Sequence, residues 1–188
     1  MRLRELQYND IDAINEWRNT SKVGLRTNGP ETILKQEDFF AQLDKRTDLR
    51  FWAVEVDTII DVNTTNDTFE PTIIGQGGFT NISLENRNAE ISLIIDPEMR
   101  GKGYGKETVD LLLDQAFNYM NLHNIYGEVY DCNDVGLLFW DGIVKQYSSY
   151  FIDLPARKYW AGQYYDSHYF NINEYWYRSN KEKTNGKV

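Results

Sequence analysis

Three glycines with basic neighbours stand between a buried apolar run and a long amphipathic stretch. Residues 94–106 read Ile-Ile-Asp-Pro-Glu-Met-Arg-Gly-Lys-Gly-Tyr-Gly-Lys, with glycine at 101, 103 and 105. Glycine adopts backbone conformations that let successive N–H groups converge, and a helix that starts directly afterwards adds partial positive charge. Arg100, Lys102 and Lys106 bring formal positive charge to the same turn. This combination is typical of a binding site for a phosphate or pyrophosphate group.

The spacing excludes two nucleotide-binding motifs. A P-loop requires Ser or Thr after its Gly-Lys pair, whereas Glu107 follows Gly105-Lys106 here. A dinucleotide-binding turn requires a third glycine at the position where, counting from Gly101, this chain has Lys106. The glycine turn can also be interpreted as a plain strand-to-helix connection that binds no ligand.

The glycine turn resembles the acetyl-CoA motif of the GNAT superfamily of N-acetyltransferases, Arg/Gln-x-x-Gly-x-Gly/Ala, which is matched by Arg100-x-x-Gly103-x-Gly105. Residues 87–95 resemble the splayed strand before that motif, and residues 122–129 with Asn133 resemble the strand and the asparagine after it. The resemblance extends over about residues 2–175. Two further stretches are similar to the branch with ribosomal-protein N-terminal and spermidine acetyltransferases: Trp17-Arg18-Asn19 and Gly162-x-Tyr164-x-Asp166.

The resemblance implies acetyl-CoA as the cosubstrate. Backbone groups of residues 93–95 would pair with the pantetheine arm as an added strand does, and the amides of residues 100–106 would hold the pyrophosphate. Asn133 would contact the CoA arm as it leaves the sheet, and Trp140 would pack near its thiol end. The implied cofactor-binding residues are Leu93, Ile94, Ile95, Arg100, Gly101, Lys102, Gly103, Tyr104, Gly105, Lys106, Asn133 and Trp140.

Acetyl transfer to an amine requires a proton acceptor for the amine, a donor to the oxyanion and a proton for the departing thiolate. In the family's geometry a strand N–H near Ile94 donates to the oxyanion. Glu90 is an even number of residues away on the same predicted strand, so both side chains face one side of the sheet. A glutamate matches this place in spermidine acetyltransferase-like sequences, which makes Glu90 the expected base or water-positioning residue. The alternative is an exposed Glu90 with no such role.

The proton donor is where this sequence departs from the family. Trp140 stands where relatives usually carry a tyrosine followed by Glu-Lys-x-Gly-Phe, and an indole cannot act as a general acid. Tyr130, at the end of the preceding strand, and Tyr147 are the candidate replacements, although packing would also explain both and water is another donor. We predict Tyr130, with Glu90, as a catalytic residue.

The elements that must position these residues are marked by apolar periodicity. A stripe at i, i+3, i+4, i+7, i+8 and i+11 from Val109 predicts a helix directly after the turn. We expect an α+β (α/β-like) fold with a single mixed, mostly antiparallel sheet flanked by helices. A loop over residues 57–70 would join two strands of a hairpin, and residues 166–177 would form the last strand. One domain is expected over residues 1–177, with a flexible polar tail over residues 178–188.

The overall composition bears on the partners. Twenty Lys and Arg against twenty-nine Asp and Glu give a net charge of −9, which disfavours nucleic acid and anionic membranes and favours a cationic partner. One cysteine and two histidines argue against a disulfide framework or a structural zinc site, so no metal is expected. No apolar run reaches the roughly 18 residues of a membrane span, and the charged start lacks a signal-peptide pattern. We therefore expect a cytoplasmic protein.

Together these observations predict an acetyl-CoA-dependent N-acetyltransferase in which a primary amine attacks the thioester directly. The acceptor would be a polyamine, an amino sugar or aminoglycoside, or a protein N-terminus, and a homo-oligomer is left open. A CoA-binding module that has lost catalysis is the alternative, because Trp140 replaces the family's acid. An unrelated phosphate-binding protein is a third interpretation.

Overall fold

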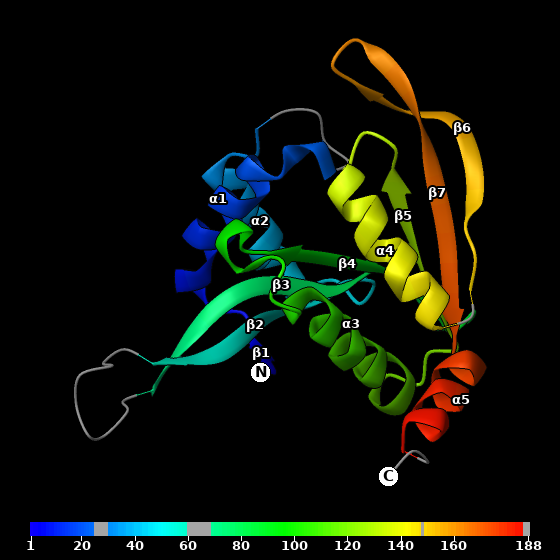
Figure 1. Ribbon diagram of the computed structural model, residues 1–188. Coiled ribbons are helices and arrows are strands. Elements are labelled where there is room, and N and C mark those ends of the chain that lie inside the picture. The colour runs from blue at the N-terminus through cyan, green and yellow to red at the C-terminus, as the bar shows by residue number, and fades with distance from the viewer. Residues whose placement is uncertain (25–29, 60–68, 148, 186–188) are drawn as a thin grey trace.

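A single sheet runs through the computed structural model, which describes residues 1–24, 30–59, 69–147 and 149–185 (Figure 1). Its strands are β1 (Arg2–Glu5), β2 (Arg50–Ile59), β3 (Phe69–Ser83), β4 (Asn88–Ile95), β5 (Asn124–Tyr130), β6 (Ile152–Trp160) and β7 (Gln163–Asn173). In the described part of the chain the strand order is β1-β2-β3-β4-β5-β7-β6. Among these described strands only β4 and β5 pair in parallel, and the other neighbours are antiparallel. The predicted mixed, mostly antiparallel sheet is therefore confirmed.

Helices cover both faces of this sheet. They are α1 (Ile11–Thr20), α2 (Ile33–Leu43), α3 (Tyr104–Asp114), α4 (Asp134–Gln146) and α5 (Glu174–Asn185), with short helical turns at Tyr8–Asp10, Lys22–Gly24, Pro97–Met99 and Gln115–Tyr119. On one face, α1 and α2 pack over Ala53 and Ile94. On the other face, α3, α4 and α5 pack over Phe79, Ile91 and Phe170. No helix among the described residues is long and apolar enough to cross a membrane.

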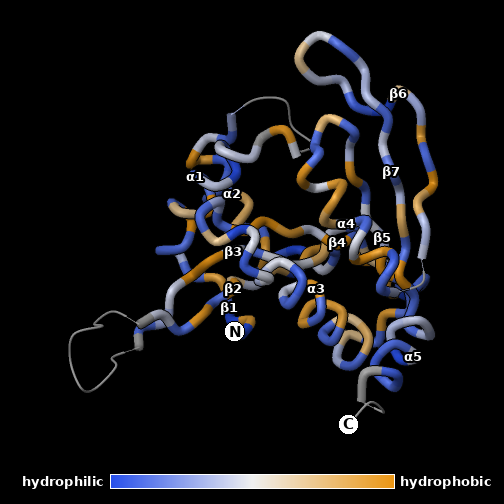
Figure 2. Tube along the Cα trace, viewed as in Figure 1, coloured by the Kyte–Doolittle hydropathy of each residue, from blue (hydrophilic) through white to orange (hydrophobic). Residues whose placement is uncertain are grey.

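The helix predicted after the glycine turn is α3 together with the turn that continues it. Val109, Leu112, Leu113 and Ala116 are fully buried, as their spacing indicates. Figure 2 shows that apolar residues are concentrated on the central strands and on α3, whereas α5 is mostly hydrophilic. Burying a side chain of the size of valine or leucine contributes about 1.5–3 kcal/mol, so this stripe anchors α3 and fixes where its N-terminus lies.

The C-terminal part of the chain differs from the expectation. The predicted last strand ends at Asn173, whose side chain accepts a hydrogen bond of 3.0 Å from the Trp176 amide and so starts α5. Tyr177, expected on that strand, is buried on α5 and donates to Asp114 at 3.1 Å. The tail expected from residue 178 is the continuation of α5 as far as residue 185. Residues 186–188 and most of the hairpin loop expected over residues 57–70 lie outside the described residues.

Strand β6 was not predicted from the sequence. It is the last strand of the described sheet, and most of its residues are exposed or half-buried. An exposed edge strand carries little of the alternation between apolar and polar residues that marks a strand in a sequence.

Candidate active site

The parallel strands β4 and β5 pair only where they begin. Their ladder joins Asn88–Glu90 to Asn124–Tyr126 and ends there. Beyond it, β4 continues to Ile95 and β5 to Tyr130, and Figure 1 shows the two strands running apart. In the described sheet, the backbone groups of residues 91–95 that face β5 therefore have no neighbouring strand. Such an edge can pair with an extended ligand, and it contains the predicted pantetheine-binding residues Leu93, Ile94 and Ile95.

The glycine turn lies between the open end of β4 and the first turn of α3. Gly101 and Gly103 have φ angles of +75° and +91°, and a Cβ atom on either would meet nothing within 4 Å. These two glycines are thus required by backbone conformation, and the space beside them is open. Gly103 is the N-cap of α3, so the amides of Tyr104, Gly105 and Lys106 are among those with no acceptor inside the helix. These amides and the open space beside the two glycines form a cradle, which fits a pyrophosphate.

The third glycine of the motif has a different role. A Cβ atom on Gly105 would lie 3.0 Å from the ring of Phe139. Gly105 therefore lets Phe139 of α4 pack closely against the start of α3.

The three basic residues of the turn are not equivalent. The Arg100 guanidinium donates to the carbonyl oxygen of Ile95 at 3.2 Å and to the hydroxyl of Ser21, and so connects the end of β4 with the end of α1. Desolvation lowers the pKa of Arg100, although Asp96 acts in the opposite direction. Lys102 and Lys106 are exposed, and the Lys102 amine lies 3.4 Å from the sulfur of Met99. The two lysines thus add positive charge to the turn, whereas Arg100 joins two elements of the fold.

Asn133 lies at the open end of β5, as the sequence predicts. Its Oδ1 accepts a hydrogen bond of 3.1 Å from the Gly136 amide and caps α4. A Cβ atom on Gly24 would lie 2.7 Å from its Nδ2, so the turn after α1 passes close beside it. Because Ser21 contacts Arg100, the segment from residue 21 to residue 24 bridges the open ends of both strands. A contact between Asn133 and CoA stays a prediction.

Glu90 is the last residue of β4 that pairs with β5. Only 6% of its surface is exposed, which excludes the exposed Glu90 of the alternative interpretation, and its Oε2 accepts a hydrogen bond of 2.9 Å from Asn81. Ala89 and Ile91 face α3, so Glu90 and Ile94 face the side of α1 and α2. Four residues of strand separate Glu90 from Ile94 by about 13 Å, so the carboxylate would reach an amine beside Ile94 through water.

Tyr130 occupies the corresponding place on β5, four residues past Tyr126. It is buried on the same face as Glu90, because Glu90 and Tyr126 are paired. Its hydroxyl lies 3.4 Å from the Glu128 carboxylate, and the Lys158 ammonium lies 5.0 Å from the centre of its ring. Burial lowers the pKa of Lys158. Glu128 and Lys158 were not predicted as site residues: Lys158 comes from the unpredicted β6, and Glu128 stands on a predicted strand with no motif to mark it.

Tyr147, the other candidate proton donor, and Trp140, a predicted cofactor-binding residue, both make packing contacts in the core. The Tyr147 hydroxyl donates to Asp110 on α3 at 2.6 Å, and burial strongly raises the pKa of this phenol. Tyr147 is fully buried on the side of α3 and α5, away from the face of Glu90. Trp140 packs between α4 and β7, with its ring 5.1 Å from Phe139 and 4.8 Å from Phe170. Of the two predicted tyrosines, only Tyr130 shares the face of Glu90.

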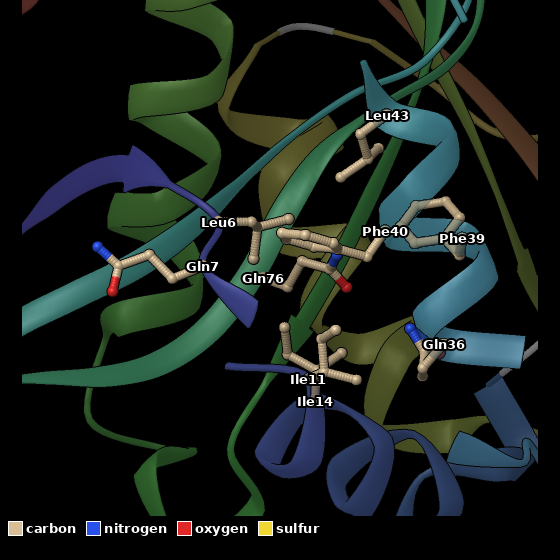
Figure 3. Close-up of a pocket in the computed structure, with 9 residues that line it drawn as sticks. All are labelled: Leu6, Gln7, Ile11, Ile14, Gln36, Phe39, Phe40, Leu43 and Gln76. Carbon is tan, nitrogen blue, oxygen red and sulfur yellow. The ribbon is translucent and has the colours of Figure 1, made fainter. Parts of the chain in front are cut away.

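A small pocket lies on the same face, between α1, α2 and β3 (Figure 3). It is lined by Leu6, Gln7, Ile11, Ile14, Gln36, Phe39, Phe40, Leu43 and Gln76. Gln76 is the cross-strand partner of Ile94, so the pocket borders the strand at which acyl transfer is expected. The lining carries no charge, which makes the pocket unsuited to a cation. Among the described residues no group of three His, Cys, Asp or Glu is arranged to hold a metal ion.

Comparisons with known proteins agree with this geometry. The family model described as an acetyltransferase (GNAT) domain matches residues 1–134. The spermidine N(1)-acetyltransferase of Vibrio cholerae is 39% identical over 54 residues, which span 29% of this chain and 31% of that protein. An uncharacterized N-acetyltransferase, p20 of Bacillus licheniformis, is 29% identical over 128 residues, or 68% of each chain.

The fold is similar to that of solved acetyltransferase structures. The crystal structure of spermidine N-acetyltransferase from Vibrio cholerae, in complex with CoA and spermine, superposes with a TM-score of 0.78 at 23% identity and covers 94% of this chain and 97% of that one. A second structure of the spermidine/spermine enzyme, in complex with manganese ions, has a TM-score of 0.68 at 22% identity. At this level of identity the likeness concerns the fold.

Proposed function

The chain belongs to the acetyltransferase (GNAT) family, and on that premise we propose that it transfers the acetyl group of acetyl-CoA to a primary amine. The observation that carries the proposal is the open edge of β4 beside the glycine cradle at the start of α3. An extended arm and a pyrophosphate are the two parts of CoA that such a pair of features accommodates. The solved relative binds CoA, which supports the same choice of cosubstrate.

Backbone groups and charged side chains of this chain would both bind acetyl-CoA. Backbone groups of Leu93, Ile94 and Ile95 pair with the pantetheine arm, and the amides of residues 101–106 hold the pyrophosphate. Lys102 and Lys106 add positive charge beside these amides. Bound acetyl-CoA supplies the thioester, whose acyl carbon is the electrophile.

The transfer forms one bond and breaks one. The amine nitrogen bonds to the acyl carbon, the carbon–sulfur bond breaks, and the electron pair of that bond leaves on sulfur. Glu90 takes the proton that the amine loses, through water, and a β4 N–H near Ile94 on the open edge donates to the oxyanion that develops. Tyr130 gives its phenolic proton to the thiolate and regains one from solvent. The products are the N-acetyl amine and CoA.

A polyamine is the acceptor class that we infer. The net charge of −9 attracts a polycation, and the buried carboxylate of Glu90 lies on the face where the amine must approach. Similarity to spermidine acetyltransferases supports the same class. Amino sugars, aminoglycosides and protein N-termini are the classes against which it is to be compared.

Binding and turnover test this function separately. Acetyl-CoA should raise the melting temperature, while ATP and NAD should not; a ligand at 100 times its Kd stabilises by about 2.7 kcal/mol. Release of free thiol from acetyl-CoA is then measured with spermidine, spermine, glucosamine, an aminoglycoside and a short peptide. Thiol release that is fastest with the polyamines supports the proposal. Stabilisation without release for any amine would instead indicate a CoA-binding module.

A further inference from the structure

Asn81 combines an unusual backbone conformation with a contact to the proposed base. It lies on β3 with a φ angle of +51°, a region that few residues other than glycine adopt, although asparagine tolerates it better than most. Its Nδ2 donates a hydrogen bond of 2.9 Å to Oε2 of Glu90 on the neighbouring strand. The side chain of Asn81 is exposed, whereas that of Glu90 is buried.

A β-bulge accounts for the direction of the Asn81 side chain. The ladder between β3 and β4 pairs Thr80 with Glu90 and then Ser83 with Asn88, so Asn81 and Ile82 together oppose Ala89. In a regular ladder Asn81 would oppose Ala89 and face α3. In the bulge, Ile82 packs against the core that contains Ala89, and Asn81 reaches Glu90 on the opposite face.

The bulge is also anchored from outside the strand pair. The Ile82 amide donates to the carbonyl oxygen of Asp48 at 3.1 Å, which fixes the backbone beside Asn81. Bulges of this kind occur beside active sites, where they redirect a side chain. The exposed Asn81 side chain contributes little to the core, so core packing does not explain why an asparagine holds this conformation.

We propose that Asn81 is a positioning residue for Glu90: the bulge aims its amide at the carboxylate and holds Glu90 ionised at the vertex of the splayed strands. A donor to a carboxylate stabilises the charged form and restricts its rotamers. This inference rests on the proposed function for the part that Glu90 takes in acetyl transfer, but the pairing itself can be measured without turnover.

Two substitutions tolerate the backbone conformation of Asn81 and remove its amide donor. Asn81→Gly adopts the positive φ without strain and removes the donor, and Asn81→Asp keeps the size while it replaces the donor with a negative charge. We expect Asn81→Gly to lower kcat about tenfold, the effect of one hydrogen bond to a charged group, with the KM for acetyl-CoA and the melting temperature unchanged. Asn81→Asp should also move the acid limb of the pH–rate profile to higher pH, because like charges disfavour an ionised Glu90.

Matched controls isolate the route through Glu90. Asn86→Asp places the same new charge at an exposed position of the same hairpin and should leave the profile unmoved. In a Glu90→Gln background, Asn81→Gly should cost nothing further, because residues that act as one unit are not additive. An independent and equal loss in that background would overturn the proposal.

A measurement without turnover separates this inference from the proposed function. The carboxyl carbon of Glu90 is followed by NMR against pH, with Glu90→Gln used to assign its signal. We expect the midpoint to move to higher pH in Asn81→Gly, and an unchanged midpoint would refute the pairing even in an inactive protein. A different result would refute the positioning role and leave the proposed function standing. In that case the wild type is active, Glu90→Gln lowers kcat, and Asn81→Gly has the kcat of the wild type.

Discussion

Glu90 is buried at the point where β4 and β5 separate, with a carboxylate oxygen fixed by Asn81. Glu90→Gln keeps the size of the side chain and removes its basicity, since a carboxamide does not accept a proton from an amine. We expect kcat to fall about 100-fold, at the low end of general-base effects. The Kd for acetyl-CoA, measured by calorimetry, should be unchanged because Glu90 lies away from the glycine turn. An unchanged kcat would remove Glu90 from the mechanism.

Substitution by phenylalanine distinguishes the role of Tyr130 from that of Trp140. Tyr130→Phe deletes only the hydroxyl, and we expect kcat to fall about 100-fold if that hydroxyl protonates the thiolate. Trp140→Phe should leave kcat within about threefold, because phenylalanine still offers an apolar ring to the thiol end of CoA, and should lower the free energy of unfolding by about 1–2 kcal/mol, because the indole packs against Phe139 and Phe170. Steady-state rates and urea unfolding measure both. Equal rates for Tyr130→Phe and wild type would assign the proton to water.

At the scale of elements, the glycine turn can be tested at two positions two residues apart. Gly103→Ala forces a positive φ on alanine, which we expect to cost about 1–2 kcal/mol of stability and to weaken acetyl-CoA binding about tenfold as the amides shift. Gly105→Ala gains about 1 kcal/mol of helix propensity, but its new Cβ crowds the ring of Phe139. Because these two effects oppose each other, stability and affinity should change little. Urea unfolding and calorimetry measure both quantities. Equal losses of affinity would contradict these separate roles.

His168 connects three elements at the open end of β5. Its Nδ1 lies 2.7 Å from Asp153 on β6, and its Nε2 lies 2.6 Å from Asp131 after β5. Burial lowers the pKa of His168, but the hydrogen bonds to the two carboxylates outweigh it, so the pKa lies above its ordinary value of 6.5. The stabilisation is therefore complete below that ordinary value and is lost as the pH rises through the raised pKa.

The pH dependence of stability follows from the raised pKa of His168. Relative to His168→Gln, the wild-type melting temperature should be higher by about 1–3 °C near pH 6, and the difference should shrink towards pH 8. Thermal unfolding of both proteins across that range measures it. A difference that grows with pH would mean that the neutral imidazole is the stabilising form.

The elements that the sequence predicts are those with a local signal. The turn at residues 100–106 and the stripe from Val109 are contiguous, so their structure follows from spacing alone. The contact between Asn81 and Glu90 depends on a bulge, and Lys158 reaches Tyr130 from an exposed edge strand; neither has a periodic pattern. The start of α5 depends on a single cap at Asn173, which the apparent alternation of the preceding strand conceals.

At the scale of the whole molecule, the net charge of −9 repels acetyl-CoA, because acetyl-CoA is itself anionic. Lys102 and Lys106 bring positive charge to the glycine turn, and under the proposed function the acidic remainder of the chain attracts a cationic acceptor. If this field steers the acceptor, kcat/KM for spermidine should fall about tenfold between about 10 mM and about 200 mM salt, as screening shortens the range of the field.

A monoamine is the matched control, because it carries one charge where spermidine carries three. Its kcat/KM should fall much less with salt, and kcat at saturating spermidine should not change, since the field acts on encounter and not on the transfer step. Steady-state rates at several ionic strengths with both amines decide the matter. Equal salt dependence for the two amines would assign the acidity to solubility and leave acceptor choice to residues such as Glu90 and Lys158 on the face of α1 and α2.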